Sequence, residues 1–550
     1  MTCPKPRLRC SSVLVVGGVL IGLVACAGTH EGMGSSAGHK GPEVQQGNSG
    51  TQRFVPGLYA GFDETRAMRT VALGDSYYRA PASEGYEAVM AHLRGELESA
   101  GYGTVSGFRI ETLVIDPAYD AWTPRAASVA LYSGDGSRSV LHSFEQQSDR
   151  DRLMMPVGAP DCDVTGRAVF RIRDVEAGTI LVTHAPARKD VLRRARLAGA
   201  VAVLSSSLAS YNVEPGSMQP LEDALRLRVY PQGSQLPVGQ ISRRAHARIE
   251  AEHEASGSAR IEFMARAERE VRPLRVLVGI VEGAQHPGEA VVLPSHIRYA
   301  GASDNASGFG ASLESARLLA QQIQSGELQR PARSLVFLWG PEITQSRAWL
   351  EQAEMRAVAA ITAVACGDSS GGGGSGQLLE RMPDPGAIEA LAPDEHTQWG
   401  SGDVDPESFS ANGLALIARC ALSDVALASG GWRTADHPWE GGSDPDAYIE
   451  VGVPAVLLWH FSSSWYHTSL DRLDKIDPAE LKRSAVSALA TALAVASPGP
   501  EDLERYLRSV DMEESVRVAA ALKAGNLELA THWEDWCAGT RDWLRELCGS

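Results

Sequence analysis

Continuous apolar segments that alternate with amphipathic ones restrict the fold of this 550-residue chain more than any other feature. A strand without a polar face is buried on both sides, which is typical of a largely parallel sheet. Helical patterns cover residues 307–323 and 479–496. The sequence therefore predicts an α/β fold, in which a mostly parallel mixed sheet is covered by helices on both faces. The apolar segments are residues 274–283, 290–296, 333–340, 357–368 and 452–460.

A second α/β pattern precedes this block. Residues 178–184 and 200–206 are predicted strands, and residues 187–197 between them form a basic helix. This βαβ unit resembles a protease-associated (PA) domain. The resemblance implies an inserted domain that shapes substrate access and carries no catalytic group. Any βαβ unit with a glycine at the end of its helix would give the same pattern.

The domain boundaries follow from these patterns. Residues 83–101 have one apolar helical face, and residues 109–116 are a predicted strand, so the main domain begins before the PA-like insertion. The expected units are a signal peptide (1–25), a flexible tether (26–52), the first part of the main domain (53–145), the PA-like domain (146–258), the rest of the main domain (259–500) and a small helical extension (501–550).

The N-terminus has the pattern of an export signal. Lys5, Arg7 and Arg9 precede an apolar run that is too short and too rich in glycine for a stable membrane span. The run ends Leu-Val-Ala-Cys at Cys26, which resembles the lipobox of bacterial lipoproteins, where the cysteine becomes lipidated. A plain signal peptide with an incidental cysteine is the alternative. The resemblance implies a cell-envelope lipoprotein, facing the periplasm or the surface, that contacts the membrane through its lipid anchor only.

Charge and cysteine usage exclude other classes of protein. The net charge of −17 argues against a nucleic-acid-binding protein, because affinity for phosphate requires a basic surface. Five cysteines follow Cys26, and the chain has no Cys-x-x-Cys pair, which disfavours a zinc site made of cysteines. Cys537 and Cys548 are the pair expected to form a disulfide in an oxidising compartment. Their spacing also fits a single helix without a bridge.

Five residues with metal-binding side chains follow the predicted strands. His296 closes one strand, Asp304 lies just before a helix, Glu342 and Asp368 follow two further apolar segments, and His467 follows the last one. In such sheets the functional site lies beyond the carboxyl ends of the strands. Two histidines and three carboxylates suit a pair of zinc ions that share a carboxylate and activate a water. Each residue alone is more often a cap or a loop hydrogen-bonder, so the prediction depends on the whole series.

Three segments resemble the co-catalytic zinc aminopeptidases and glutamate-carboxypeptidase-like metallopeptidases. The segments are GASDNASGFGASLESARLL at residues 301–319, WYHTSLDRLDKID at residues 465–477, and the strand that leads into Pro341-Glu342. The resemblance covers most of residues 80–500. It implies hydrolysis of a peptide bond, at a free N-terminus of a peptide substrate.

The resemblance also implies a role for each site residue. Two zinc ions would be bound. Glu342 is the only acid after its strand, so it can either bind zinc or act in catalysis by carrying a proton, and we assign it mainly to the metal. Asn305 would help to set the bend of the loop that carries Asp304. The implied arrangement has Asp304 bridging both ions, His296 and Asp368 completing one zinc, and Glu342 and His467 completing the other.

Departures from the family pattern leave a second interpretation open. The family's His-x-Asp motif is here His296-Ile297-Arg298, which places a cation where a carboxylate would orient the ligand. The family's Glu-Glu pair is here Pro341-Glu342, and the turn that follows it is shortened to residues 343–346. These changes favour a catalytically impaired pseudo-peptidase that binds peptides or a partner, whereas the complete set of ligand types favours an active enzyme.

Three other motifs predict different sites. VALGDSY at residues 71–77 resembles the nucleophile block of GDSL-type esterases, with Ser76 as nucleophile, but the chain has no Asp-x-x-His segment to supply the base. GDSSGG at residues 367–372 resembles the chymotrypsin-like GDSGG motif, without a histidine segment to complete a triad. GGSDPDAYIE at residues 441–450 is either a substrate-facing loop or a surface turn.

Overall fold

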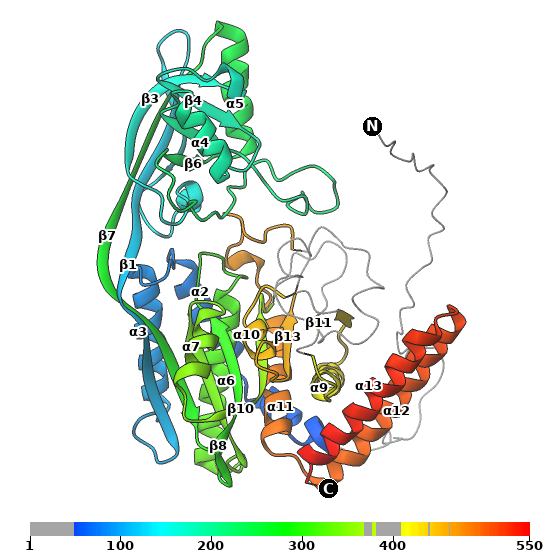
Figure 1. The fold of residues 1–550 in the computed structure, drawn as a ribbon. Coiled ribbons are helices and arrows are strands. Elements are labelled where there is room, and N and C mark those ends of the chain that lie inside the picture. Colours follow the sequence, from blue (N-terminus) through cyan, green and yellow to red (C-terminus); the bar gives the residue numbers. More distant parts are fainter. Residues whose placement is uncertain (1–48, 368–376, 381–408, 438–440, 461–462, 550) are drawn as a thin grey trace, which may run out of the picture. The chain divides into compact units, whose positions relative to one another are not determined.

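The computed structural model describes residues 49–367, 377–380, 409–437, 441–460 and 463–549, all of which belong to one compact unit. Its strands form one continuous sheet in the order β12-β11-β13-β10-β8-β9-β7-β3-β4-β5-β6, with β1 paired to β7 and β2 paired to β1 (Figure 1). The larger part of the sheet consists of β7 (Arg260–Val281), β8 (His286–His296), β9 (Arg333–Gly340), β10 (Arg356–Val364), β11 (Gln377–Glu380), β12 (Thr434–His437) and β13 (Ala455–Trp459).

The centre of this sheet is parallel. Strand β10 pairs in parallel with both β8 and β13, and β8 pairs in parallel with β9. Antiparallel neighbours flank this centre, because β7 runs against β9 and β11 runs against β13. The predicted mostly parallel mixed sheet is therefore confirmed, and each of the five apolar segments overlaps one of its strands.

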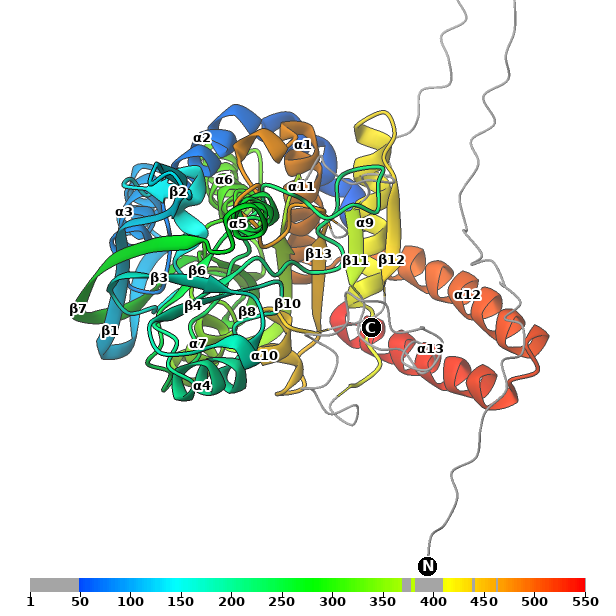
Figure 2. The ribbon, with the colours of Figure 1, turned by 90° about the horizontal axis from the view of Figure 1, so that it is seen from above.

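Helices cover both faces of the sheet, as predicted. Successive side chains of a strand point to opposite faces. Val276 and Val278 of β7 accordingly pack into one core cluster with Trp349 of α7, while Leu277 packs into the other cluster with Phe309 of α6. Figure 2 shows the sheet between these layers. The first layer holds α7 (Thr344–Gln352) and α10 (Pro445–Ile449), and the second holds α1 (Val55–Gly61), α2 (Glu64–Asp75), α3 (Glu84–Ser99), α6 (Ala306–Ser325), α9 (Leu414–Ala428) and α11 (Pro478–Ala496).

A long two-stranded ribbon joins the larger part of the sheet to the smaller part. Strand β1 (Phe108–Tyr132) pairs with β7 from Phe108, opposite Val281, to Tyr132, opposite Arg260. The strand predicted at residues 109–116 is thus only the first third of β1. The polar residues that hid its continuation lie in an exposed ribbon, where pairing with β7 continues across three register shifts.

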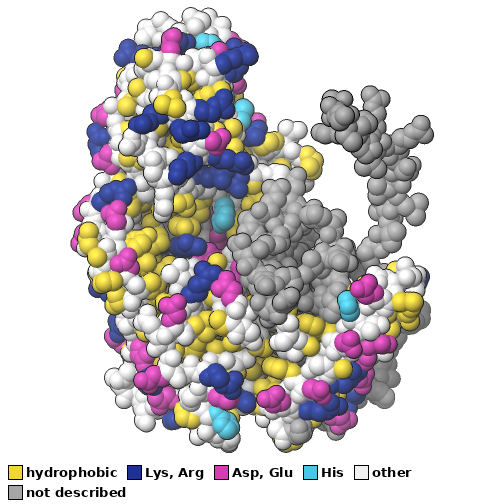
Figure 3. All heavy atoms as spheres, viewed as in Figure 1, with side chains coloured by type: hydrophobic (Ala, Val, Ile, Leu, Met, Phe, Trp, Pro, Cys, Tyr) yellow, Lys and Arg dark blue, Asp and Glu magenta, His cyan; other side chains and the backbone are white. Residues whose placement is uncertain are grey.

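The smaller part of the sheet contains the predicted βαβ unit. Strands β4 and β5 are parallel, and α4 connects them. Side chains of Lys and Arg gather over this region (Figure 3), and α4 itself carries Lys189, Arg193, Arg194 and Arg196. Its assignment as a PA domain stays a prediction. The elements of this part are β2 (Arg138–Phe144), β3 (Cys162–Val169), β4 (Thr179–Thr183), α4 (Lys189–Leu197), β5 (Ala202–Ser205), β6 (Val238–Gln240) and α5 (Arg243–Ser256).

Two helices follow the main domain, α12 (Pro500–Lys523) and α13 (Leu527–Leu547), and they lie side by side in both ribbon views (Figures 1 and 2). The disulfide expected between Cys537 and Cys548 is wrong, because all five cysteines of the described residues are free. Cys537 lies within α13 and Cys548 caps it, so the helical rise separates them by about 16 Å along the axis. Every helix of the described residues is too short or too polar to cross a lipid bilayer.

Candidate metal centre

The carboxyl ends of the parallel strands hold the candidate ligands. His296 is the last residue of β8, Glu342 follows the end of β9 at Gly340, and His467 lies in the loop after β13. Asp304 precedes α6, which begins two residues later. Parallel strands present their carboxyl ends at one edge of a sheet, which brings residues from distant parts of the chain to one place.

Asp304 lies between the two histidines. Its Oδ1 is 3.1 Å from Nε2 of His296, and its Oδ2 is 3.0 Å from Nε2 of His467. Burial favours the neutral acid, but the hydrogen bonds from His296 and His467 hold the pKa of Asp304 well below its usual range. The carboxylate thus presents one oxygen to each imidazole.

The loop that carries Asp304 is fixed by neighbouring polar side chains. Nδ2 of Asn305 donates to the main-chain oxygen of His296 at 3.0 Å, and Oδ1 accepts from the backbone N–H of Ala365 at 3.3 Å. The bend-setting role of Asn305 stays a prediction. The carboxylate of Asp471 accepts from the backbone N–H groups of Ser303 and Asp304, at 2.6 and 3.0 Å. Sequence reasoning quoted Asp471 only as part of a motif and gave it no role.

Glu342 makes its contacts on the His296 side of the site. Its Oε2 accepts from Nη2 of Arg298 at 3.1 Å, and its Oε1 accepts from Oγ of Ser443 at 3.0 Å. The same Oε1 lies 3.7 Å from Nδ1 of His296. The resemblance assigns Glu342 to the same zinc as His467, but in the structure its carboxylate is hydrogen-bonded to Arg298 and Ser443.

Asp444 is a buried member of the site that sequence reasoning missed. It is fully buried, accepts from the backbone N–H of Ile343 and from the side chains of Gln345 and Ser346, and lies 3.6 Å from Nδ1 of His296. It belongs to residues 441–450, for which a surface turn was one of two interpretations. That interpretation is wrong for Asp444, and its isolated position in the sequence gave no signal of a contact with β8.

The donor set fits zinc. Nδ1 of the buried His296 has no hydrogen-bond partner. Burial disfavours the charged imidazole, yet the carboxylates of Glu342, Asp304 and Asp444 outweigh it and raise the pKa of His296 to about 10, so the cavity carries excess negative charge. Two ligand atoms on one tetrahedral zinc, each about 2.0–2.1 Å from the metal, lie about 3.3 Å apart. The 3.0 and 3.1 Å contacts of Asp304 have nearly this length.

Other predicted site residues divide into two groups. Asp368, Cys26 and all of the GDSSGG motif after Gly367 lie outside the described residues. Ser76 is described, and its Oγ donates to the main-chain oxygen of Leu73 at 2.6 Å as it caps α2. No histidine hydrogen-bonds to Ser76 in the described part of the chain, so the esterase interpretation has no base in the structure.

Comparisons with known proteins agree with the fold. No protein-family model matches this sequence. The chain is 26% identical over 538 residues to the Zea mays protein named probable glutamate carboxypeptidase VP8. This match covers 83% of the present chain and 69% of the maize protein. The structure superimposes on a peptidase M28 precursor from Shewanella amazonensis with a TM-score of 0.52 at 17% identity, and the match covers 81% of this chain and 97% of that one. The predicted fold class is thereby confirmed.

Proposed function

We propose that this chain is a zinc-dependent exopeptidase. The observation that supports it most is the carboxylate of Asp304, whose two oxygens each contact Nε2 of a different histidine, His296 and His467, at the carboxyl edge of a parallel sheet. The names of the maize and Shewanella relatives are those of peptidases. We propose two zinc ions, because His296 and His467 contact different oxygens of Asp304 rather than the same one.

Each residue then has a defined task. Zinc, when bound, supplies a Lewis acid that polarises the scissile carbonyl and acidifies a water. His296, Asp304 and His467 hold the metal, and Asp471 holds the Asp304 loop through two backbone N–H groups. Glu342 is assigned mainly as a ligand. It is also the acid available to carry a proton toward the leaving amine, because Pro341 has no group that can do so.

A free N-terminus is the end of the peptide that the sequence resemblance implies. One observation favours a carboxypeptidase instead. In the PA-like segment, Arg226 forms an isolated antiparallel β-bridge with Thr468. The N–H of the next residue, Leu227, donates to the main-chain oxygen of His467 at 2.8 Å. The guanidinium of Arg226 belongs to the segment that pairs with the His467 loop, and a guanidinium is suited to binding the C-terminal carboxylate of a peptide.

Turnover of end-blocked peptides tests these alternatives. An aminopeptidase cleaves C-terminally amidated peptides and fails on N-acetylated ones, and a carboxypeptidase shows the reverse. Either activity should disappear with a chelator, return with Zn²⁺ and be absent from Asp304→Asn. A wild-type protein that binds such peptides but cleaves none, with its zinc bound, would establish the pseudo-peptidase alternative.

We further propose that Cys26 carries a lipid anchor and that the protein faces the periplasm or the cell surface. The support is the Leu-Val-Ala-Cys sequence after an apolar run. Several acyl chains on one residue anchor firmly, whereas one chain binds a membrane only weakly. Cells partitioned in detergent should yield the wild-type protein in the detergent phase and Cys26→Ala in the aqueous phase. Wild-type protein in the aqueous phase would reject the anchor.

A further inference from the structure

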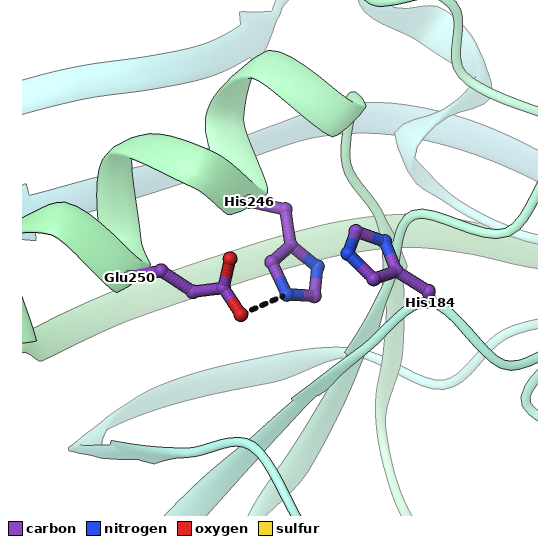
Figure 4. Close-up of side chains that lie close together, drawn as sticks. All are labelled: His184, His246 and Glu250. Carbon is purple, nitrogen blue, oxygen red and sulfur yellow. Dashed lines mark ion pairs between the residues drawn. The ribbon is translucent and has the colours of Figure 1, made fainter. Parts of the chain in front are cut away.

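Three metal-binding side chains meet in the smaller part of the sheet, outside the site around Asp304. His184 follows the end of β4, and His246 and Glu250 lie one turn apart on α5. One ligand atom from each of the three lies within 4.8 Å of the other two. Figure 4 shows Glu250 turned toward the His246 ring and the His184 ring on its other side. Positions i and i+4 of a helix share one face, so α5 presents His246 and Glu250 together.

Ser206 orients both imidazoles. Its Oγ lies 2.8 Å from Nδ1 of His184 and 2.9 Å from Nδ1 of His246, and it donates toward the main-chain oxygen of Thr183 at 3.4 Å. A hydroxyl oxygen has two acceptor positions and one proton. With that proton directed to Thr183, the oxygen accepts from both Nδ1–H groups. In this tautomer the Nε2 atom of each histidine is the one that can ligate a metal, and Nε2 of His246 faces the Glu250 carboxylate.

The surroundings of both histidines disfavour the charged imidazole. Burial, the neighbouring His184 and the charge of Arg243 together lower the pKa of His246 to about 4. Burial and Arg243 also lower the pKa of His184. The positive charge of Arg243 opposes a cation, and the carboxylate of Glu250 offsets it.

The spacing suits a tetrahedral ion that remains open to solvent. Nε2 of His246 is 3.4 Å from Oε1 of Glu250, close to the separation of about 3.3 Å for two ligands on one zinc. The His184 ring stacks on His246 with centroids 3.8 Å apart and planes 10° from parallel. Its Nε2 must tilt to join the ion, and the exposure of His184 leaves room for this movement.

We propose that His184, His246 and Glu250 form a second site for a divalent transition-metal ion of the zinc type, with three protein ligands and one open position. The site is separate from the one around Asp304, because its ligands come from β4 and α5 and are oriented by Ser206. His246 is buried in the domain, whereas His184 and Glu250 face solvent, so an ion enters from their side.

Zinc titration of the full chain tests this site. Asp304→Ala serves as the parent protein, so that the result is independent of the proposed peptidase centre. After chelation and dialysis, Zn²⁺ affinity is measured by competition with a chromophoric chelator, and bound Co²⁺ is followed by its visible absorption. The parent should bind an ion tetrahedrally, and either His184→Ala or Glu250→Gln should weaken Zn²⁺ binding at least about tenfold.

His253→Ala is the matched control, because it removes a histidine from the same helix outside the cluster. It should bind Zn²⁺ as the parent does. His184 and Glu250 are partly solvent-exposed, so their variants should keep the thermal unfolding temperature of the parent and report on binding alone. A parent that takes up no Zn²⁺ would overturn the proposal, and so would His184→Ala and Glu250→Gln proteins that bind it with the parent's affinity.

Discussion

Nη2 of Arg298 lies 3.1 Å from Oε2 of Glu342, so a guanidinium is paired with the carboxylate that the sequence assigns to zinc. Arg298 also contacts Tyr299, which its Nη1 reaches at 3.0 Å and over whose ring its guanidinium lies. An arginine held in this way competes with a metal ion for Glu342. It also adds a positive charge two residues after the ligand His296.

Replacing Arg298 should therefore strengthen metal binding. In Arg298→Ala, Glu342 is free to ligate and a repulsive charge is removed, and changes around metal ligands typically alter metal affinity 10–100-fold. We expect Zn²⁺ affinity to rise by at least about tenfold in competition titrations. Arg347→Ala is the matched control, because it breaks an Arg–Glu pair with Glu450 without touching the site, and should leave the affinity unchanged. Unchanged binding by Arg298→Ala would show that the arginine does not compete with zinc for Glu342, and weaker binding would show that it supports the centre.

Asp444→Asn should destabilise the loop after β9. The substitution keeps the side-chain shape but replaces one acceptor oxygen with an NH₂ group. Oδ2 accepts from Gln345 at 3.0 Å and Oδ1 from Ile343 and Ser346, so at least one buried donor loses its partner. A buried unsatisfied donor costs about 1–3 kcal/mol, and we expect urea unfolding to report a loss of this size.

Asp446→Asn provides the contrast for that experiment. Burial raises the pKa of Asp446 to about 7, so a neutral amide there replaces a carboxyl that is already partly neutral at pH 7. Its unfolding free energy should change less than that of Asp444→Asn. If both variants lost the same free energy of unfolding, the hydrogen bonds of Asp444 would not contribute more to stability than those of Asp446.

The sequence was sufficient for the central sheet, and it named three of the side chains that meet at the candidate metal centre. Segments such as residues 333–340 are buried on both faces, so their apolar character alone marks them as strands, and β9 has these same bounds. His296, Asp304 and His467 could be found because the first closes a strand, the second precedes a helix and the third lies in the loop after the last apolar strand. Their common location then follows from the direction of parallel strands.

Contacts between distant loops were beyond sequence reasoning. Asp444 binds residues about one hundred positions earlier, and Asp471 binds the Asp304 loop from 167 positions later. Neither has a local pattern that separates it from an ordinary loop carboxylate. The same holds for Arg298. Its sequence position indicated a lost carboxylate, whereas only the structure shows which group the arginine contacts.

Glu314 should make the protein less stable as the pH rises. Burial raises its pKa from 4.5 to about 7, against the opposing effect of Arg66 and Arg317. Between these values the folded state binds more protons than the unfolded state, so the free energy of unfolding falls as the pH rises through this window. The thermal unfolding temperature of Glu314→Gln, relative to wild type, should therefore increase from pH 5 to pH 8.

Glu289→Gln should show the opposite trend. The hydrogen bond from Arg333 lowers the pKa of Glu289, so its stabilising contribution is present at pH 8 and declines as the pH falls below the ordinary carboxyl range. Parallel pH dependence in the two variants would contradict the assignment for Glu314.

Cys537 and Cys548 should both be free thiols in the purified protein. A disulfide requires Cα atoms within about 7 Å, and these residues lie three turns apart on α13. Alkylation in denaturant without reductant, followed by peptide mass analysis, should label both cysteines. A bridged peptide that appears only without reductant would show that α13 ends differently.

Asn212 should couple the PA-like part to the candidate metal centre. Its Nδ2 donates to the main-chain oxygens of Ser464 and Tyr466, at 2.9 and 3.0 Å, in the loop that carries His467, and its side chain is fully buried. Asn212→Ala removes both bonds and leaves two carbonyls without this donor. We expect about 1–3 kcal/mol less stability in urea.

Asn212→Ala should also shift His467, because the main-chain oxygen of His467 accepts from the N–H of Leu227, which lies in the same PA-like segment as Asn212. We therefore expect weaker Zn²⁺ binding in Asn212→Ala, measured below the temperature at which the variant unfolds. Asn212→Asp separates the two effects, since it keeps the acceptor for the N–H of Ala209 at 3.0 Å but loses the donor to the His467 loop. If Asn212→Asp bound Zn²⁺ with wild-type affinity, the segment would stabilise the fold without positioning the ligand.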